Sequence, residues 1–174
     1  KKEGTILASL IEDLTSTLNE EEEIYQKLIP IEEEKTQVII ENNLQALSEI
    51  TKKEQGFISM INQLEKKRGE IVNNIAIVLN RDSSKLTISV IIDLLDGQDE
   101  QVHLANVYDK LSNTLATMVS VNNRNKILIE QSLDMIEFNM NFYQSVQNIN
   151  NNNYDKGAHS SDGAEESGMF DARQ

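Results

Sequence analysis

The sequence contains no cysteine and no tryptophan, only one proline, and few aromatic residues, which make up 5% of its 174 residues. Without cysteine the chain has no disulfide framework and no thiolate for catalysis or metal binding. It also has no apolar run long enough to cross a membrane, and its start does not have the pattern of a secretory signal peptide. These absences are those expected of a cytoplasmic protein.

Positive charge is scarce as well, because 16 Lys and Arg residues face 29 Asp and Glu residues, for a formal net charge of −13. The acidic residues are spread along the chain, and such a surface repels nucleic acid and anionic membrane lipids. The hydrophobic fraction of 39% suits an elongated helical protein better than a compact enzyme with a large buried cleft. We therefore expect a protein partner, with no nucleic-acid binding and no membrane insertion.

What the chain does contain is apolar residues at spacings of three and four, which predict helices at about 5–41, 43–80, 87–96 and 98–148. In the first helix one position of the apolar pattern is occupied by Glu21. Pro30 predicts a kink or short break near residues 26–30, because proline removes a backbone donor and clashes with the preceding turn. The acidic clusters 20–23 and 32–34 are interpreted as a solvated helix face rather than metal ligands.

The turn signals between the helices predict how they pack. Asn43 is expected to cap the second helix, and the short Asn-Asn turn favours an antiparallel hairpin. The β-branched run after Leu86 is interpreted as a short helix capped by Thr87 and stopped by Gly97, since a single strand would leave its edges unpaired. The predicted fold is all-α: an elongated hairpin plus a third long helix, in a coiled-coil-like three-helix bundle. We expect residues 1–149 to form one domain and the polar residues 150–174 a flexible tail.

A search for catalytic or metal-binding patterns finds only Glu100-x-x-His103. Di-iron helix bundles use that spacing twice, but the other histidine, His159, has no matching glutamate. We expect His103 to be a partly exposed helix residue, and we predict no enzymatic activity, no cofactor and no metal.

The third long helix has two unusual features. Two asparagines, Asn122 and Asn125, fall on its predicted apolar stripe between Met118 and Ile129. Further on, apolar residues form two rows, one through Leu128, Met135 and Phe142 and the other through Ile129, Ile136 and Tyr143. One row is expected to pack on the hairpin, and the other to receive a partner helix, as Met and aromatic side chains do in helix-binding grooves. A fourth segment or a dimer that covers the second row is the alternative.

Three segments give the chain a resemblance to a known family. They are "EEEKTQVIIENNLQALSEITKKE" around the first turn, "NNRNKILIEQSL" with Asn122 and Asn125, and Tyr154 followed by Gly157. Over most of residues 5–160 the chain resembles the FlgN family, the cytoplasmic flagellar type III export chaperones of the hook–filament junction proteins. The family's usual Tyr-Gly element is altered here, because Asp155 follows Tyr154.

The resemblance implies a helical chaperone without catalytic activity that holds the C-terminal helices of hook-associated junction proteins and presents them to the export gate. Tyr154 is the position implied for docking to the gate. The implied cargo-binding residues are Asn122, Asn125, Leu128, Ile129, Leu133, Met135, Ile136, Met140, Phe142 and Tyr143. The two asparagines are expected to mark the passage from the hairpin core to the cargo site. Met169 and Phe170 are expected to occupy the cargo groove when cargo is absent.

Three rival interpretations remain. The first is a structural coiled-coil protein that homodimerises. The second is a metal-binding helix bundle, and the third is a secretion chaperone for filament cap or flagellin.

Overall fold

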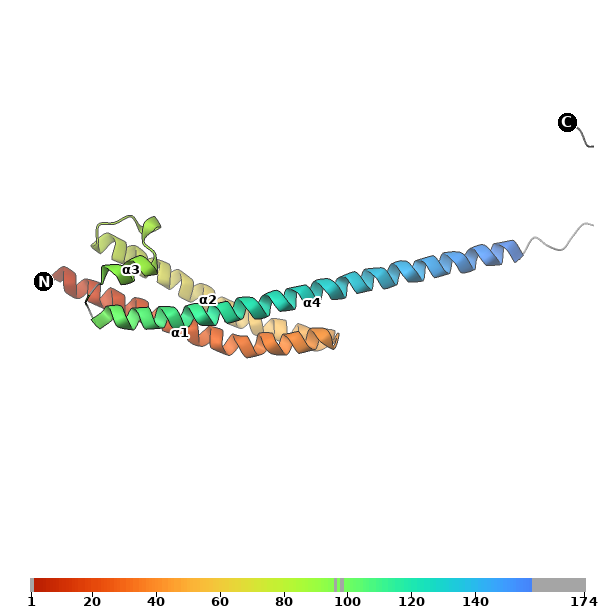
Figure 1. The fold of residues 1–174 in the computed structure, drawn as a ribbon, viewed down its shortest axis with the longest axis horizontal. Helices are drawn as coiled ribbons and strands as arrows, with labels where there is room; N and C mark the ends of the chain where they lie inside the picture. The colour runs from red at the N-terminus through yellow and green to blue at the C-terminus, as the bar shows by residue number, and fades with distance from the viewer. Residues whose placement is uncertain (1, 96, 98, 158–174) are drawn as a thin grey trace, which may run out of the picture. The chain divides into compact units, whose positions relative to one another are not determined.

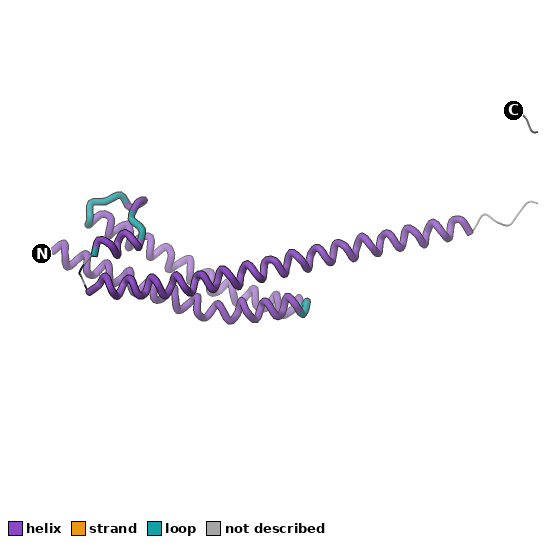
Figure 2. Tube along the Cα trace, in the orientation of Figure 1, coloured by secondary structure: helices purple, strands orange, loops and turns teal. Residues whose placement is uncertain are grey.

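The structure is a computed structural model that describes the backbone of residues 2–95, 97 and 99–157, and the side chains of residues 4–95, 97 and 99–148. Within these residues the chain forms four α-helices and a short 3-10 helix (Figure 1). Their bounds are α1 Lys2–Ile40, α2 Leu44–Val78, η1 Ser83–Lys85, α3 Ile88–Leu94 and α4 Asp99–Gly157. Figure 2 shows no strand in the described part of the chain, so the predicted all-α class is confirmed.

Helices α1 and α2 form the predicted antiparallel hairpin (Figure 1). Asn42 ends α1 in the left-handed region, with φ of 54°, a conformation that asparagine tolerates better than most residues. The next amide, of Asn43, then donates back to the Val38 carbonyl at 3.1 Å. The Asn43 side chain accepts from the Ala46 amide at 3.1 Å, so its predicted role as the cap of α2 is confirmed.

Of the kink or short break predicted near residues 26–30, the break is not present, because α1 runs through Pro30 without interruption. Leu28 and Glu32, on either side of Pro30, are both buried in the bundle. Burial of the flanking turns holds the helical conformation and offsets the lost backbone hydrogen bond.

The remaining boundaries follow the predicted turn chemistry except at the end of α4. Thr87 caps α3 by accepting from the Val90 amide at 3.3 Å, and Gly97 has φ of +78°, which ends the helical path. Helix α4 continues to Gly157, past the predicted end near residue 148. The asparagine-rich sequence after residue 148 contains no proline and no glycine before Gly157, so nothing in it breaks the helix.

The chain divides into two compact units, Lys1–Ile129 and Glu130–Gln174. In the first unit, α1, α2, α3 and the beginning of α4 share one hydrophobic core. Its fully buried members include Ile11 and Leu18 of α1, Ile75 of α2, Ile91 of α3 and Leu104 of α4. Among the described residues, no helix has the length and apolar character needed to cross a membrane.

Candidate partner-binding surface

Residues 133–146 of α4, which we call the distal segment, present large apolar side chains to solvent. Every one is more than a third exposed, and Phe138 and Tyr143 reach 69%. The set is Leu133, Met135, Ile136, Phe138, Met140, Phe142, Tyr143 and Val146. Single exposed apolar side chains are ordinary, but so many within about four helical turns form a contiguous patch of the kind that marks an interaction site.

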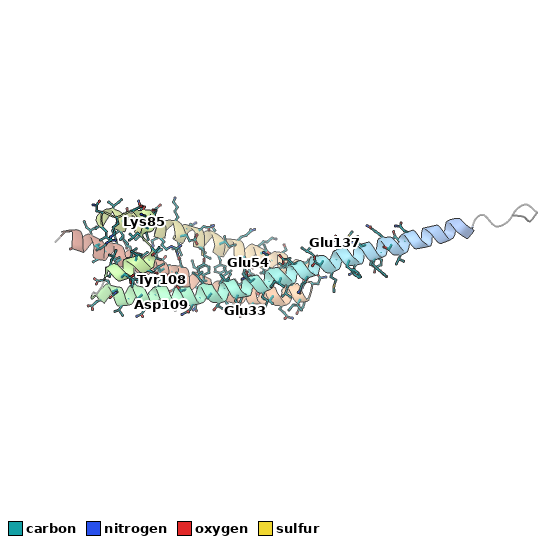
Figure 3. The ribbon with its side chains drawn as sticks, turned by 45° about the horizontal axis from the view of Figure 1, so that its top comes forward. Glu33, Glu54, Lys85, Tyr108, Asp109 and Glu137 are labelled. Atoms are coloured by element: carbon teal, nitrogen blue, oxygen red, sulfur yellow. The ribbon has the colours of Figure 1, made fainter. Side chains whose placement is uncertain are left out.

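These side chains form two rows along the distal segment. At about 100° per residue, the first row is Leu133, Ile136, Met140 and Tyr143, and the second row is Met135, Phe138, Phe142 and Val146. Side chains stand on both sides of the helix around Glu137 (Figure 3). The rings of Phe142 and Tyr143 meet edge to face, with centroids 6.3 Å apart, so the rows touch at this level.

Most residues of the predicted cargo site belong to these rows. Leu128 and Ile129 are half-buried, whereas both rows are exposed throughout the distal segment. Phe138 and Val146 are absent from the predicted site. The spacing of three and four that links Phe138 to Met135 and Phe142 is the signal that would have included it.

Asn125 lies at the centre of a buried polar cluster between α4 and α1. It is 1% exposed, and its amide nitrogen donates to the Glu32 carbonyl at 2.8 Å and to the Glu32 carboxylate at 2.9 Å. Thr36 donates its hydroxyl to the Asn125 amide oxygen at 2.5 Å. A buried amide with all these partners fixes the register of the two helices, because any slip would leave them unpaired.

Asn122, in contrast, is exposed, so its predicted position on the apolar stripe is wrong. The buried stripe passes from Met118 through Val121 to Asn125, and Val121 is 6% exposed. Steps of three then four and of four then three both fit a heptad, and only the packing of α4 decides between them.

The acidic cluster of residues 20–23 is only partly solvated, which corrects the prediction of a solvated face. Glu21 and Glu22 are each 1% exposed. Glu21 accepts from Arg68 of α2 at 2.6 Å, and its other carboxylate oxygen has no hydrogen-bond partner. Burial raises the pKa of the Glu21 carboxyl, and the charge of Arg68 opposes that shift.

Glu22 faces α4 instead, where it pairs with Lys110 at 2.8 Å and accepts from Thr114 at 3.1 Å. The two neighbouring acids of α1 therefore bind two different helices. Together these two ion pairs fix the rotation of α1 about its own axis in the bundle.

A third buried carboxylate, that of Glu54 in α2, connects the two helices of the hairpin near its turn. Lys35 of α1 lies 2.9 Å from one carboxylate oxygen of Glu54 and donates to the other at 3.0 Å, and it also pairs with Glu32 at 3.6 Å. Burial raises the pKa of the Glu54 carboxyl, with Lys35 opposing the shift. Since Glu32 also accepts from Asn125, this network links all three long helices of the first unit.

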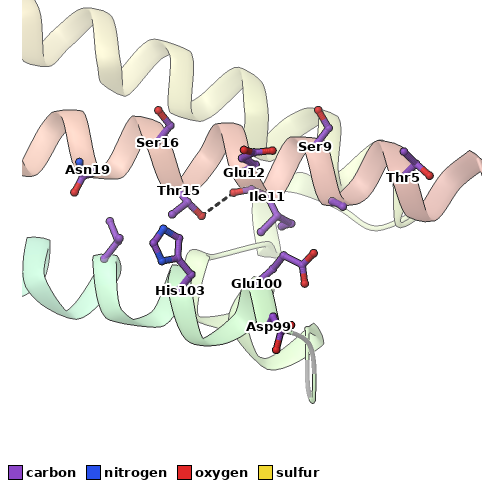
Figure 4. Close-up of a pocket in the computed structure, with 12 residues that line it drawn as sticks. Thr5, Ser9, Ile11, Glu12, Thr15, Ser16, Asn19, Asp99, Glu100 and His103 are labelled. Carbon is purple, nitrogen blue, oxygen red and sulfur yellow. Dashed lines mark hydrogen bonds between the residues drawn. The ribbon is translucent and has the colours of Figure 1, made fainter.

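A groove of about 840 Å³ lies between α1 and the beginning of α4. Figure 4 shows exposed His103 of α4 facing Thr15 of α1, whose hydroxyl donates to the Ile11 carbonyl at 2.7 Å. Glu100 and Asp99 line its other end. Among the described residues, no three or more His, Cys, Asp or Glu side chains are grouped to hold a metal ion.

The predicted gate-docking residue, Tyr154, lies in the last turns of α4, and its side chain is outside the described residues. Met169 and Phe170, predicted to occupy the cargo groove, also lie outside them.

The fold and the distal segment are those of an all-α protein whose long C-terminal helix carries an exposed apolar surface. A family model described as FlgN protein matches residues 10–161, so the chain belongs to the FlgN family, as its sequence motifs predicted. This is a family of flagellar export chaperones rather than enzymes, and that general role is the role of this chain.

One relative extends the comparison. The chain is similar to the uncharacterized protein YvyG of Bacillus subtilis (strain 168), with 29% identity over 133 residues, which are 76% of this chain and 79% of YvyG. No solved structure matches the chain.

Proposed function

We propose that this chaperone binds the C-terminal helices of hook-associated junction proteins through the distal segment. It thereby prevents their premature assembly in the cytoplasm and delivers them to the flagellar export gate. The observation that carries the proposal is the pair of exposed apolar rows within residues 133–146. A surface of this composition gains free energy when an amphipathic helix covers it.

The physical basis of the chaperone activity is mass action. A junction protein assembles through apolar helical faces, and a chaperone that covers those faces lowers the concentration of free, assembly-competent cargo. Met135 and Met140 suit such a surface, since unbranched thioether side chains adjust to the shape of different partners.

Other predicted residues have supporting roles in this proposal. Leu128 and Ile129, both half-buried, are the last two residues of the first unit, and their spacing along α4 continues the two rows of the distal segment. Asn125 acts through position rather than contact, because its hydrogen bonds hold α4 against α1. Tyr154, close to the end of α4, is proposed to dock the complex to the export gate.

The alternative function is a structural protein that homodimerises through the same apolar rows. Both functions need the rows, but only the chaperone needs a heterologous partner. A dimer that forms without cargo and resists its addition would favour the structural function.

The proposal is tested by titration calorimetry of the full chain against the C-terminal helical segment of a junction protein from the same source. We expect binding with one cargo per chaperone, weakened at least about tenfold by Ile136→Asp. Ile77→Asp is the matched control, because Ile77 is 69% exposed on α2 and lies outside the distal segment. Equal effects of the two substitutions, or no binding by the wild-type chain, would contradict the proposal.

A further inference from the structure

The apolar surface of the distal segment is too wide for one partner helix. The two rows, with Asn139 between them, cover about 220° of the helix circumference at about 100° per residue. A helix that lies on the core of a globular protein typically presents an apolar stripe of about 100°, and the seam with a single partner helix is narrower. Two neighbours, one on each row, would cover the surface.

Within the first unit, the same helix contacts two helices through a single buried stripe at spacings of three and four, which spans about 100° of its circumference. Met118 of α4 lies in one hydrophobic cluster with Leu28 of α1 and Ile61 of α2. The two rows of the distal segment cover more than twice that width, so they can bring partner helices against two sides of α4.

The charged residues of the distal segment indicate which side chains the two partner helices should carry. Residues 133–146 include Asp134 and Glu137 but no Lys or Arg. On the helix circumference, Glu137 borders the first row and Asp134 borders the second row, about 40° from the nearest apolar side chain in each case. An acid along the outer edge of each row favours a basic residue along the edge of the helix that covers it.

We propose that the distal segment is occupied by a pair of partner helices whose apolar faces are each bordered by Lys or Arg, in a three-helix arrangement with α4 at its centre. This inference deepens the proposed function and rests on it, since the paired helices belong to the cargo. It assigns one cargo helix to each row and one acidic residue to each contact.

A second copy of this chain fits the surface less well. The distal segment of another copy would supply one helix, which covers one row. It would also bring Asp134 and Glu137 against the same two acids, and each chain carries a formal net charge of −13. Charge and width therefore both favour a heterologous pair of helices.

The assignment of one helix to each row is tested by calorimetry with a matched pair of substitutions. The probe is the complete C-terminal helical region of the junction protein, and the chaperone is the full chain. Ile136→Asp in the first row and Phe142→Asp in the second should each weaken binding at least about tenfold, and Ile77→Asp should leave it unchanged. Wild-type affinity in either row variant would show that one helix suffices and would overturn the inference, while cargo binding itself would survive.

The charge assignment is tested by association rates. The double variant Asp134→Lys/Glu137→Lys should associate with cargo about tenfold more slowly than the wild type at low salt. The difference should shrink at about 0.5 M NaCl, where charges are screened over a few ångströms. Glu33→Lys/Glu49→Lys is the control, since it changes the total charge equally at exposed positions of α1 and α2.

Equal association rates of the two double variants would contradict the proposal that Lys or Arg residues border the apolar faces of the cargo helices. Light scattering tests whether a second copy of this chain occupies the surface instead. A wild-type dimer that dissociates in both row variants would assign the surface to a second copy. Failure of the wild-type chain to bind cargo would overturn the proposed function and this inference together.

Discussion

Asn125 of α4 donates a hydrogen bond to the backbone carbonyl of Glu32 in α1 at 2.8 Å, across 93 residues of sequence. The bond lies in a buried cluster five residues before the second unit of the chain begins at Glu130. It gives the asparagine of the apolar stripe a structural role, since a buried amide that satisfies a specific carbonyl penalises other registers of the helix.

Replacing this asparagine should destabilise the bundle. In Asn125→Leu the Glu32 carboxylate and the Thr36 hydroxyl lose a buried partner, and we expect the free energy of unfolding to fall by about 1–3 kcal/mol. Urea unfolding followed by circular dichroism measures the change. Asn122→Leu, at the exposed neighbouring position, should change it by less than about 0.5 kcal/mol. Equal effects would show that the cluster does not stabilise the packing of α4.

The buried carboxyl of Glu21 should give the bundle a distinct pH dependence. Because burial raises its pKa in the folded state above the ordinary 4.5, the folded chain binds more protons than the unfolded chain between those two values. This group therefore adds to the free energy of unfolding as the pH falls through its raised pKa toward 4.5, and opposes folding at higher pH. Urea unfolding across that interval should show a smaller gain on acidification in Glu21→Gln than in the wild type. Glu33→Gln controls for the lost charge, and an unchanged profile in Glu21→Gln would contradict the assignment.

The ion pair between Glu22 and Lys110 should couple α1 to α4. Lys110→Ala leaves the buried Glu22 carboxylate with Thr114 alone, and we expect a loss of about 1–2 kcal/mol, limited by the solvent exposure of the lysine. The double variant Glu22→Gln/Lys110→Ala should lose less, because the buried charge is then absent. A double-mutant cycle by urea unfolding measures the difference. A double variant less stable than Lys110→Ala would contradict this account.

Pro30 should reduce the stability of α1 even though the helix continues through it. Pro30→Ala restores a backbone donor to the helix interior at an exposed position, and we expect the free energy of unfolding to rise by about 1–3 kcal/mol. Thermal unfolding followed by circular dichroism is the measurement, with Lys27→Ala as the control at an exposed site one turn earlier. A decrease in stability would indicate that the proline holds a shape that the bundle needs.

The helices and their caps could be predicted from the sequence because they depend on local chemistry. Asn43 and Thr87 cap α2 and α3 through their own side chains, and the spacing of apolar residues defines the buried face of α2. The register at Asn122 could not be predicted, since Val121 and Asn122 fit the heptad equally well.

The buried acids could not be predicted for a different reason. Periodicity placed Glu21 on the apolar pattern but could not identify a partner for a buried charge. The partners of Glu21, Glu22 and Glu32 lie on α2 or α4, far away in sequence. The apolar rows of the distal segment could be predicted from spacing alone, because they lie within one helix.

The central claim is that the distal segment receives the cargo, and hydrogen exchange of the full chain with and without the junction-protein segment tests it most directly. We expect cargo to slow amide exchange most strongly within residues 133–146, because covering both rows suppresses the opening of this exposed helix. Protection confined to the hairpin of α1 and α2, with unchanged exchange in the distal segment, would contradict the claim.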